Sequence, residues 1–245
     1  MGRSPRNSRP DLNGVLVVDK PLGASSMDVC RVVRRRSGGA KVGHAGTLDP
    51  LATGVLVVCL GTATRAIDSL MATEKVYEAR VDLSAFSTTD DMEGEATPVE
   101  ITREPSRADI ERACAAFVGE IMQAPPSFSA VHIDGQRAYR LARRGELGPD
   151  DLPARPVTIH KIVVREYAWP FATIDVRCGK GTYIRSLARD IGRTLGTGGR
   201  LAALRRTRVG AHTIEQAIAM DAIPEPLDPH HLLPVPDDPR AAPPS

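Results

Sequence analysis

The sequence of 245 residues has little cysteine, few aromatic residues and no long apolar run. Its four cysteines are far apart and form no C-x-x-C pair, which argues against a disulfide framework or a cysteine-rich zinc site. No run approaches the roughly 18 apolar residues that a membrane-spanning helix needs. The N-terminus contains arginines but no apolar segment, so it does not resemble a signal peptide. We therefore expect a soluble, cytoplasmic protein with no membrane partner.

Motifs for metals and nucleotide cofactors are also missing. The six histidines show no H-E-x-x-H spacing, and the adjacent His230 and His231 lie in a proline-rich segment. The chain has no G-x-S-x-G elbow, no Walker A loop and no convincing dinucleotide fingerprint. The sequence thus predicts neither a metal site nor a cofactor.

The hydrophobic pattern predicts a mixed set of strands and helices. Apolar runs and alternating patterns predict strands at residues 14–19, 54–60, 75–83, 157–167 and 171–178. Capping boxes and helical periodicity predict helices from residue 25 to about 38, from 106 to 121, and over residues 136–146 and 182–195. Because these elements interleave without a βαβ period, the predicted fold class is α+β.

Composition also divides the chain. Residues 1–12 are polar and are expected to form a disordered arm, followed by one folded domain over residues 13–215. Residues 216–245 are acidic and contain eight of the 20 prolines, which predicts an extended tail rather than a second domain. The acidic stretch at residues 89–100 resembles an exposed loop.

Charge is segregated along the chain although the net charge is only +2. Residues 31–48 carry five basic side chains and no acidic one, and residues 185–208 carry seven arginines against a single acid, Asp190. Basic stretches that share a face would attract a polyanion. A solvated helix face is the commoner explanation for any one run, but two such runs shift the interpretation towards nucleic acid.

The densest local signal is a loop that leads into a predicted strand, VGHAGTLDPLATG at residues 42–54. Asp49 precedes a proline, which biases its backbone towards an extended conformation, and flanking glycines permit close approach of a ligand. A carboxylate held in this way is a candidate nucleophile or base. An Asx-type turn is the commoner role of a lone Asp-Pro, and His44 alone is more often a turn or packing residue.

A second signal is the glycine-rich segment at residues 178–185, which leads into a predicted helix. The free N–H groups of a helix start form an anion site, although this motif alone is weak. Arg185 in the first turn is unfavourable against the helix dipole. A carboxylate or phosphate partner for its guanidinium would offset that cost.

Together these segments closely resemble the TruB family of tRNA pseudouridine synthases, which isomerise the uridine at position 55 in the T arm of tRNA. The resemblance extends over most of residues 13–210. Its motifs are GVLVVDKP at residues 14–21, the block at 42–54, KVY at 75–77, QAPPSFSA at 123–130, KGTYIR at 180–185 and LRRTRVG at 204–210.

The resemblance implies a pseudouridine-synthase fold with a mixed, largely antiparallel central sheet flanked by helices and loops. It implies that Asp49 is the nucleophile of a cofactor-free isomerisation and that Arg185 forms an ion pair with it. Tyr77 matches the aromatic residue that stacks on the target base. His44 matches a histidine near the displaced loop nucleotides, and Leu204 adds an apolar pocket wall or is a core leucine.

Two departures from the family pattern stand out. His132 occupies a position where typical members have lysine, and no PUA-type domain is expected after residue 215. The partner implied is the tRNA T-arm stem-loop, bound by a monomeric enzyme. The alternatives are a non-catalytic RNA-binding or RNA-chaperone protein, and a relative that modifies ribosomal RNA within a guide-RNA particle.

Overall fold

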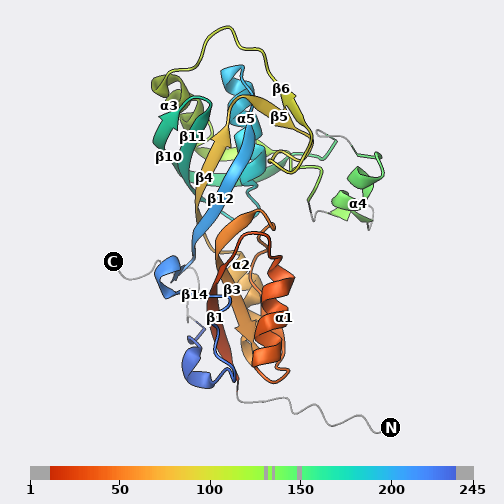
Figure 1. Ribbon diagram of the computed structural model, residues 1–245, viewed down its shortest axis with the longest axis vertical. Helices are drawn as coiled ribbons and strands as arrows, with labels where there is room; N and C mark the ends of the chain where they lie inside the picture. Colours follow the sequence, from red (N-terminus) through yellow and green to blue (C-terminus); the bar gives the residue numbers. More distant parts are fainter. Residues whose placement is uncertain (1–11, 130–131, 134–135, 148–150, 236–245) are drawn as a thin grey trace. The chain divides into compact units, whose positions relative to one another are not determined.

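The computed structural model describes residues 12–129, 132–133, 136–147 and 151–235. The described chain forms two compact units, the first from residues 12–77 and 205–235 and the second from residues 78–204. Two strands, β4 (Lys75–Asp82) and β12 (Arg200–Val209), contain the points where the chain passes between the units. Each of these strands therefore contributes residues to both units (Figure 1).

The strands of the two units include all five that the sequence predicted. Those of the first unit are β1 (Gly14–Lys20), β2 (Val42–His44), β3 (Ala52–Leu60), β13 (His212–Thr213) and β14 (Ile218–Ala219). Those of the second unit are β5 (Ala85–Ser87), β6 (Ala96–Pro98), β7 (Gly119–Gln123), β8 (His132–Ile133), β9 (Gln136–Arg137), β10 (Arg155–Ala168) and β11 (Phe171–Cys178). The five predicted strands are present as β1, β3, β4, β10 and β11, whereas β7, β12 and the shorter strands were not predicted. The helices are α1 (Ser26–Arg36), α2 (Ile67–Met71), α3 (Arg107–Ala115), α4 (Ala138–Arg143) and α5 (Ile184–Leu195), with 3-10 turns η1 (Gly61–Ala66), η2 (Ile214–Gln216) and η3 (Pro229–His231).

The predicted α+β class with a mixed, largely antiparallel sheet is confirmed. Hydrogen-bonded neighbours follow the order β14-β1-β3-β12-β4-β11-β10-β7, with β2 on β3 and β13 on β12. The pairs β1–β3, β10–β11 and β7–β10 are antiparallel, whereas β1 and β14 are parallel. Within the described part of the chain, no helix is long and apolar enough to cross a membrane.

In the first unit, α1 and α2 cover opposite faces of the sheet. Alternate residues of a strand point to opposite faces, so Val18 packs with Val29 of α1 while Val17 packs with Leu70 of α2. The predicted capping box is present, because Ser25 Oγ accepts a hydrogen bond from the backbone of Asp28 and the Asp28 side chain accepts one in return. Figure 1 shows α1 lying along β1 and β3.

In the second unit, α3 packs against α5 and β10. The helix predicted to run from residue 106 to 121 ends at Ala115 instead. Gly119 has a φ of +116°, which helical residues do not adopt, and it begins strand β7. Ile121 then pairs with Val157 of β10, so ladder hydrogen bonds replace the last helical turn.

The acidic stretch at residues 89–100 is not simply an exposed loop. Asp90 and Asp91 are 5% and 2% exposed, and they form ion pairs with Arg189 and Arg185. The arginine run at residues 185–208 is therefore not one basic surface, since several of its members neutralise buried or half-buried acids. In the pairs of Asp91 with Arg185 and of Asp90 with Arg189, the acidic stretch supplies the carboxylate and the arginine run supplies the guanidinium.

Residues 216–235 are also not an extended tail. Strand β14 pairs with β1, and Ile223 and Leu227 are buried in the core cluster that contains α1. The backbones of Val15 and Leu233 exchange hydrogen bonds of 2.8 Å. Apolar residues spaced between the prolines thus fix this segment to the first unit. Leu12, assigned by the sequence to the disordered arm, is fully buried there, and residues 1–11 lie outside the described residues.

Burial of His212 predicts a pH dependence of stability. His212 is 3% exposed, and desolvation lowers the pKa of its imidazole. At acid pH the unfolded chain then binds a proton that the folded chain does not, so stability falls as pH drops below the unfolded value of about 6.5. The expected slope is up to about 1.4 kcal/mol per pH unit for this group. Urea unfolding between pH 8 and 5 should show a flatter dependence for His212→Gln, and an equal slope in both proteins would exclude the assignment.

Candidate active site

Asp49 lies in a loop between β2 and β3 that the first unit anchors to α1. The hydroxyl of Ser26 donates a hydrogen bond to the carbonyl of Leu48 and accepts one from its N–H, at 3.1 and 2.9 Å. The carbonyl of Pro50 accepts the N–H of Gly23 at 2.8 Å. Asp49 itself is only half-buried. A partly exposed carboxylate therefore stands between two backbone segments that are fixed on both sides.

Arg206 anchors the other side of this loop from β12. Its side chain is 1% exposed, and its guanidinium donates to the carbonyls of Val55, Gly46 and Thr47 at 2.8, 3.0 and 3.5 Å. The planar group with several donors suits this task, because one side chain can bind carbonyls of both the loop and the following strand. A Cβ at Gly54 would overlap the carbonyl oxygen of Arg206, so only glycine fits there.

Lys20 places a second buried cation near Asp49. Its ammonium group donates to the carbonyls of Pro21 and Ala24 at 3.0 and 2.7 Å, and its side chain is fully buried. Burial lowers the pKa of Lys20, while the carboxylate of Asp49 opposes that shift. The loop carboxylate therefore lies in the positive field of Lys20. Sequence reasoning missed the roles of Lys20 and Arg206, although both belong to the quoted motifs.

His44 lies at the end of β2, just before this loop. Its Nδ1 atom is buried and has no hydrogen-bond partner among the described residues. Burial, followed by the positive charge of Arg206, lowers the pKa of His44. The lowered pKa favours the neutral imidazole at physiological pH.

Tyr77 is 9% exposed in β4, where it follows the predicted alternation with Ala79 and Val81 as further buried residues. Leu204 lies in β12 and is partly exposed. Tyr77 is the last residue of the first unit before the chain enters the second. Leu204 is the last residue of the second unit before the chain returns to the first. Their contact with a base remains a prediction.

Arg185 begins the buried face of α5 in the second unit and is 7% exposed. Its Nη1 atom donates to the carbonyl of Thr89 at 3.1 Å and lies 3.4 Å from a carboxylate oxygen of Asp91, and Nη2 donates to the carbonyl of Phe128. The sequence predicted a carboxylate partner, and Asp91 is one. Asp49 belongs to the first unit, and its ion pair with Arg185 remains a prediction.

The start of α5 is partly occupied by protein groups rather than open to an anion. Gln123 accepts a hydrogen bond from the N–H of Tyr183 at 2.8 Å and donates one to its carbonyl at 3.1 Å. Arg189 bonds Asp90 at 2.8 Å one turn later. The glycine-rich segment thus positions α5 and its arginines. The sequence alone did not distinguish this structural role from the predicted anion binding.

One set of side chains in the described chain has the spacing of metal ligands. Ligand atoms of Asp228, His230 and His231 lie within 4.8 Å of one another on the segment around η3. His231 Nδ1 already accepts the N–H of Asp228 at 3.0 Å, so only its other nitrogen is left for an ion. These residues lie at or near the surface, and the contacts described for the Asp49 loop involve none of them.

Comparison with known families decides what this arrangement belongs to. Residues 34–184 match the family model described as TruB family pseudouridylate synthase (N terminal domain). The chain belongs to the TruB family of pseudouridylate synthases. Residues 185–228 match the model described as tRNA pseudouridylate synthase B C-terminal domain, which extends beyond the boundary predicted at residue 215. The resemblance deduced from the sequence motifs is thereby confirmed, and the chain is an isomerase of this class.

Two curated relatives illustrate how similar family members are. A protein of Thermobifida fusca named tRNA pseudouridine synthase B is 50% identical over 219 residues, which cover 86% of this chain and 74% of the relative. A protein of the same name from Cupriavidus pinatubonensis is 46% identical over 239 residues, which cover 95% and 75%. High identity over nearly the whole chain places both units within the family.

Solved structures agree with this fold at lower identity. A chain in the crystal structure of a Cbf5-Nop10-Gar1 complex superimposes with a TM-score of 0.68 and 28% identity over 91% of this chain. A structure of an H/ACA RNP bound to a substrate RNA containing 2'-deoxyuridine gives 0.65 and 27%. This chain spans 59% and 58% of those two chains. The shared part is therefore the fold described above.

Proposed function

We propose that this protein isomerises the uridine at position 55 in the T arm of tRNA to pseudouridine, with Asp49 as the nucleophile and no cofactor. The observation that carries the proposal is the Asp49 loop, in which Ser26, Lys20 and Arg206 fix the backbone around a half-buried carboxylate. Relatives with 45–50% identity are named tRNA pseudouridine synthase B, whereas the matching chains of the Cbf5-Nop10-Gar1 complex and the H/ACA RNP are less than 30% identical. The tRNA substrate is therefore favoured over ribosomal RNA.

The chemistry requires a base that has left its stack. A uridine inside a folded loop cannot reach a carboxylate, so it must be flipped out at a cost of a few kcal/mol. Stacking on Tyr77 and contact of a displaced loop nucleotide with His44 would help to offset that cost. These are the roles that we assign to the two residues, with Leu204 as an apolar wall.

The isomerisation itself exchanges one bond to the ribose for another. The glycosidic C–N bond breaks, the uracil rotates while it is held, and C5 forms the new bond to the ribose. The proton that C5 loses is balanced by the proton that N1 gains. We assign the nucleophilic attack on the uridine to Asp49. We assign to Arg185 the role of stabilising the negative charge of that carboxylate. Asp91 and the carbonyls of Thr89 and Phe128 hold the guanidinium of Arg185 in one orientation.

Incubation with unmodified tRNA tests the proposal directly. The protein alone, without metal or other additive, should convert one uridine, and mapping should place the new pseudouridine at position 55. A T-arm stem-loop should suffice as substrate, because every proposed contact is to that arm. Absence of pseudouridine from both RNAs, with binding intact, would favour the non-catalytic RNA-binding alternative.

A further inference from the structure

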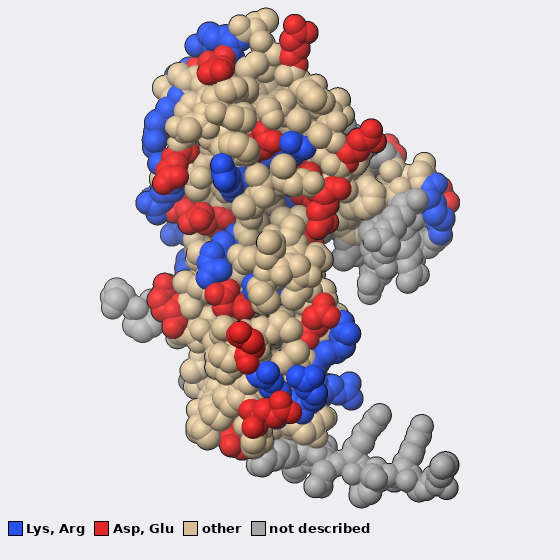
Figure 2. All heavy atoms as spheres, viewed as in Figure 1, with Lys and Arg blue, Asp and Glu red and all other residues tan. Residues whose placement is uncertain are grey.

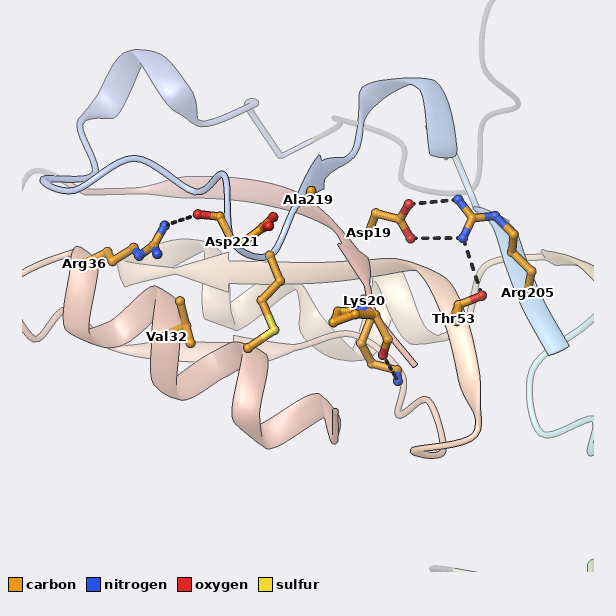
Figure 3. Close-up of a pocket in the computed structure, with 10 residues that line it drawn as sticks. Asp19, Lys20, Val32, Arg36, Thr53, Arg205, Ala219 and Asp221 are labelled. Atoms are coloured by element: carbon orange, nitrogen blue, oxygen red, sulfur yellow. Dashed lines mark hydrogen bonds and ion pairs between the residues drawn. The ribbon is translucent and has the colours of Figure 1, made fainter. Parts of the chain in front are cut away.

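A cavity of about 470 Å³ lies in the first unit, and Lys20, which also binds the loop carbonyl of Pro50, is among the residues that line it. It is bounded by the ends of several elements (Figure 3). Its walls include Asp19 and Pro21 at the end of β1, Val32 of α1, Thr53 of β3, Arg205 of β12 and Met220 after β14. Small-molecule sites occupy about 300–1,000 Å³, so this cavity is large enough for a nucleoside.

The cavity lies at the carboxyl ends of two parallel strands. Strands β1 and β14 pair at Val18–Ile218 and Asp19–Ala219, and the chain then turns away at Met220. Crevices outside the carboxyl ends of parallel strands are frequent ligand sites in α/β sheets. Arg36 closes the opposite end, where its guanidinium donates to the carbonyl of Asp221 at 3.1 Å, as Figure 3 shows.

The lining combines apolar walls with one polar edge. Val32 and Met220 supply the apolar surface. Arg205 bonds both carboxylate oxygens of Asp19 at 3.2 and 2.8 Å and lies 3.4 Å from the hydroxyl of Thr53. The Arg205 and Asp19 side chains remain 38% and 32% exposed. An apolar slot beside a paired guanidinium and carboxylate matches a nucleobase, which has apolar faces and an edge of donors and acceptors.

Two features beside this cavity favour RNA as its ligand, namely the adjacent Asp49 loop and the arginines of α1. Thr53 is the second residue of the strand that follows the Asp49 loop, and Pro21 lies two residues before Gly23, whose N–H bonds the loop carbonyl of Pro50. The outer face of α1 carries exposed arginines, and Figure 2 shows basic side chains gathered where α1 lies in Figure 1. The exposed arginines of α1 are Arg31, Arg34 and Arg35. Phosphates bound there would place unpaired bases near the cavity.

We propose that this cavity binds an unpaired nucleotide of the RNA substrate other than the uridine that reacts. The proposal rests on the proposed function for its substrate class. The base inserts between Val32 and Met220, and its edge meets Arg205, Asp19 and Thr53. The cavity is thus a second nucleotide site that helps to hold the loop open while Asp49 acts.

Filling the cavity tests this site. Ala219 lines the cavity and is exposed, so Ala219→Trp places an indole there without displacing a core side chain. We expect the Kd for unmodified T-arm stem-loop to rise about tenfold, as loss of one stacked base would cause. Ala96→Trp is the matched control, because Ala96 is an exposed alanine in the short strand β6 of the second unit.

A set of stem-loops with one abasic position each identifies the nucleotide. One position outside the target uridine should weaken binding to the unsubstituted protein about tenfold and leave Ala219→Trp unchanged, since coupled changes to one contact are not additive. Asp19→Asn retains the side-chain volume and should show the same coupling if Ala219→Trp fails to fold, as monitored by its thermal midpoint.

The outcomes separate this proposal from the proposed function. If pseudouridine forms but Ala219→Trp binds RNA as the unsubstituted protein does, or stays sensitive to every abasic position, the second site is excluded while the isomerase remains. If no pseudouridine forms but the abasic coupling is present, the site remains and the isomerase proposal fails. If free nucleoside monophosphates bind in the cavity but no abasic position weakens binding of the stem-loop, the cavity does not bind a nucleotide of the RNA substrate.

Discussion

Replacing Asp49 by asparagine should abolish pseudouridine formation while tRNA binding remains within about threefold. The amide keeps the volume of the side chain but is a poor nucleophile, so the single-turnover rate should fall by at least about a thousandfold. The loop should keep its structure, because Ser26, Arg206 and Gly23 hold it through backbone groups. The rate is measured on unmodified tRNA under enzyme excess, and binding is measured by filter retention.

Asp68→Asn is the control for this experiment. Asp68 is an exposed acid of the first unit in α2, so the same change of charge there should leave the rate unaltered. Full turnover by Asp49→Asn would exclude the nucleophile role. Loss of both turnover and binding would show instead that the variant has lost its fold, which circular dichroism would reveal.

Arg206→Lys should leave the protein folded but reduce kcat about ten- to a hundredfold with little change in KM. An ammonium group is a compact donor and cannot bind the carbonyls of Gly46, Thr47 and Val55 together. Backbone acceptors left without a partner should lower the free energy of unfolding by about 1–3 kcal/mol. A loop that has lost this anchor positions its carboxylate less well, and misplacement by about 1 Å can cost about a hundredfold in rate.

Arg208→Lys provides a matched comparison on the same strand. Arg208 pairs with Glu74 and donates to the carbonyl of Gly210, and it makes none of the loop contacts. Its replacement should therefore affect stability slightly and kcat hardly at all. Equal kinetic losses in the two variants would indicate a general effect on β12 and would contradict a specific role of Arg206 at the loop.

Several features of this protein followed from local sequence. The capping box of Ser25 and Asp28, the alternation along β4 and the apolar runs of β1 and β3 each depend on residues close together in the chain. Local hydrogen bonds and a fixed side-chain period determine such elements, so they could be predicted accurately. The block around Asp49 likewise identified the candidate nucleophile because its residues are contiguous.

Features that depend on distant partners could not be predicted in this way. The segment after residue 216 has the composition of a tail, yet Ile223 and Leu227 complete the core beside α1. The expected continuation of α3 is replaced by β7, because pairing with β10 is available only in the folded chain. Composition and periodicity contain no information about which remote surface a short apolar segment can reach.

The sequence by itself determined the family, the class of fold and the carboxylate at the centre of the loop. Only the tertiary structure showed which charged side chains are buried and which groups they bind. Asp90 and Asp91 are about a hundred residues from their arginines, and Arg206 is about 160 residues from the carbonyl of Gly46. Burial of a charge is unfavourable without a partner, and partners at such separations are brought together only by folding.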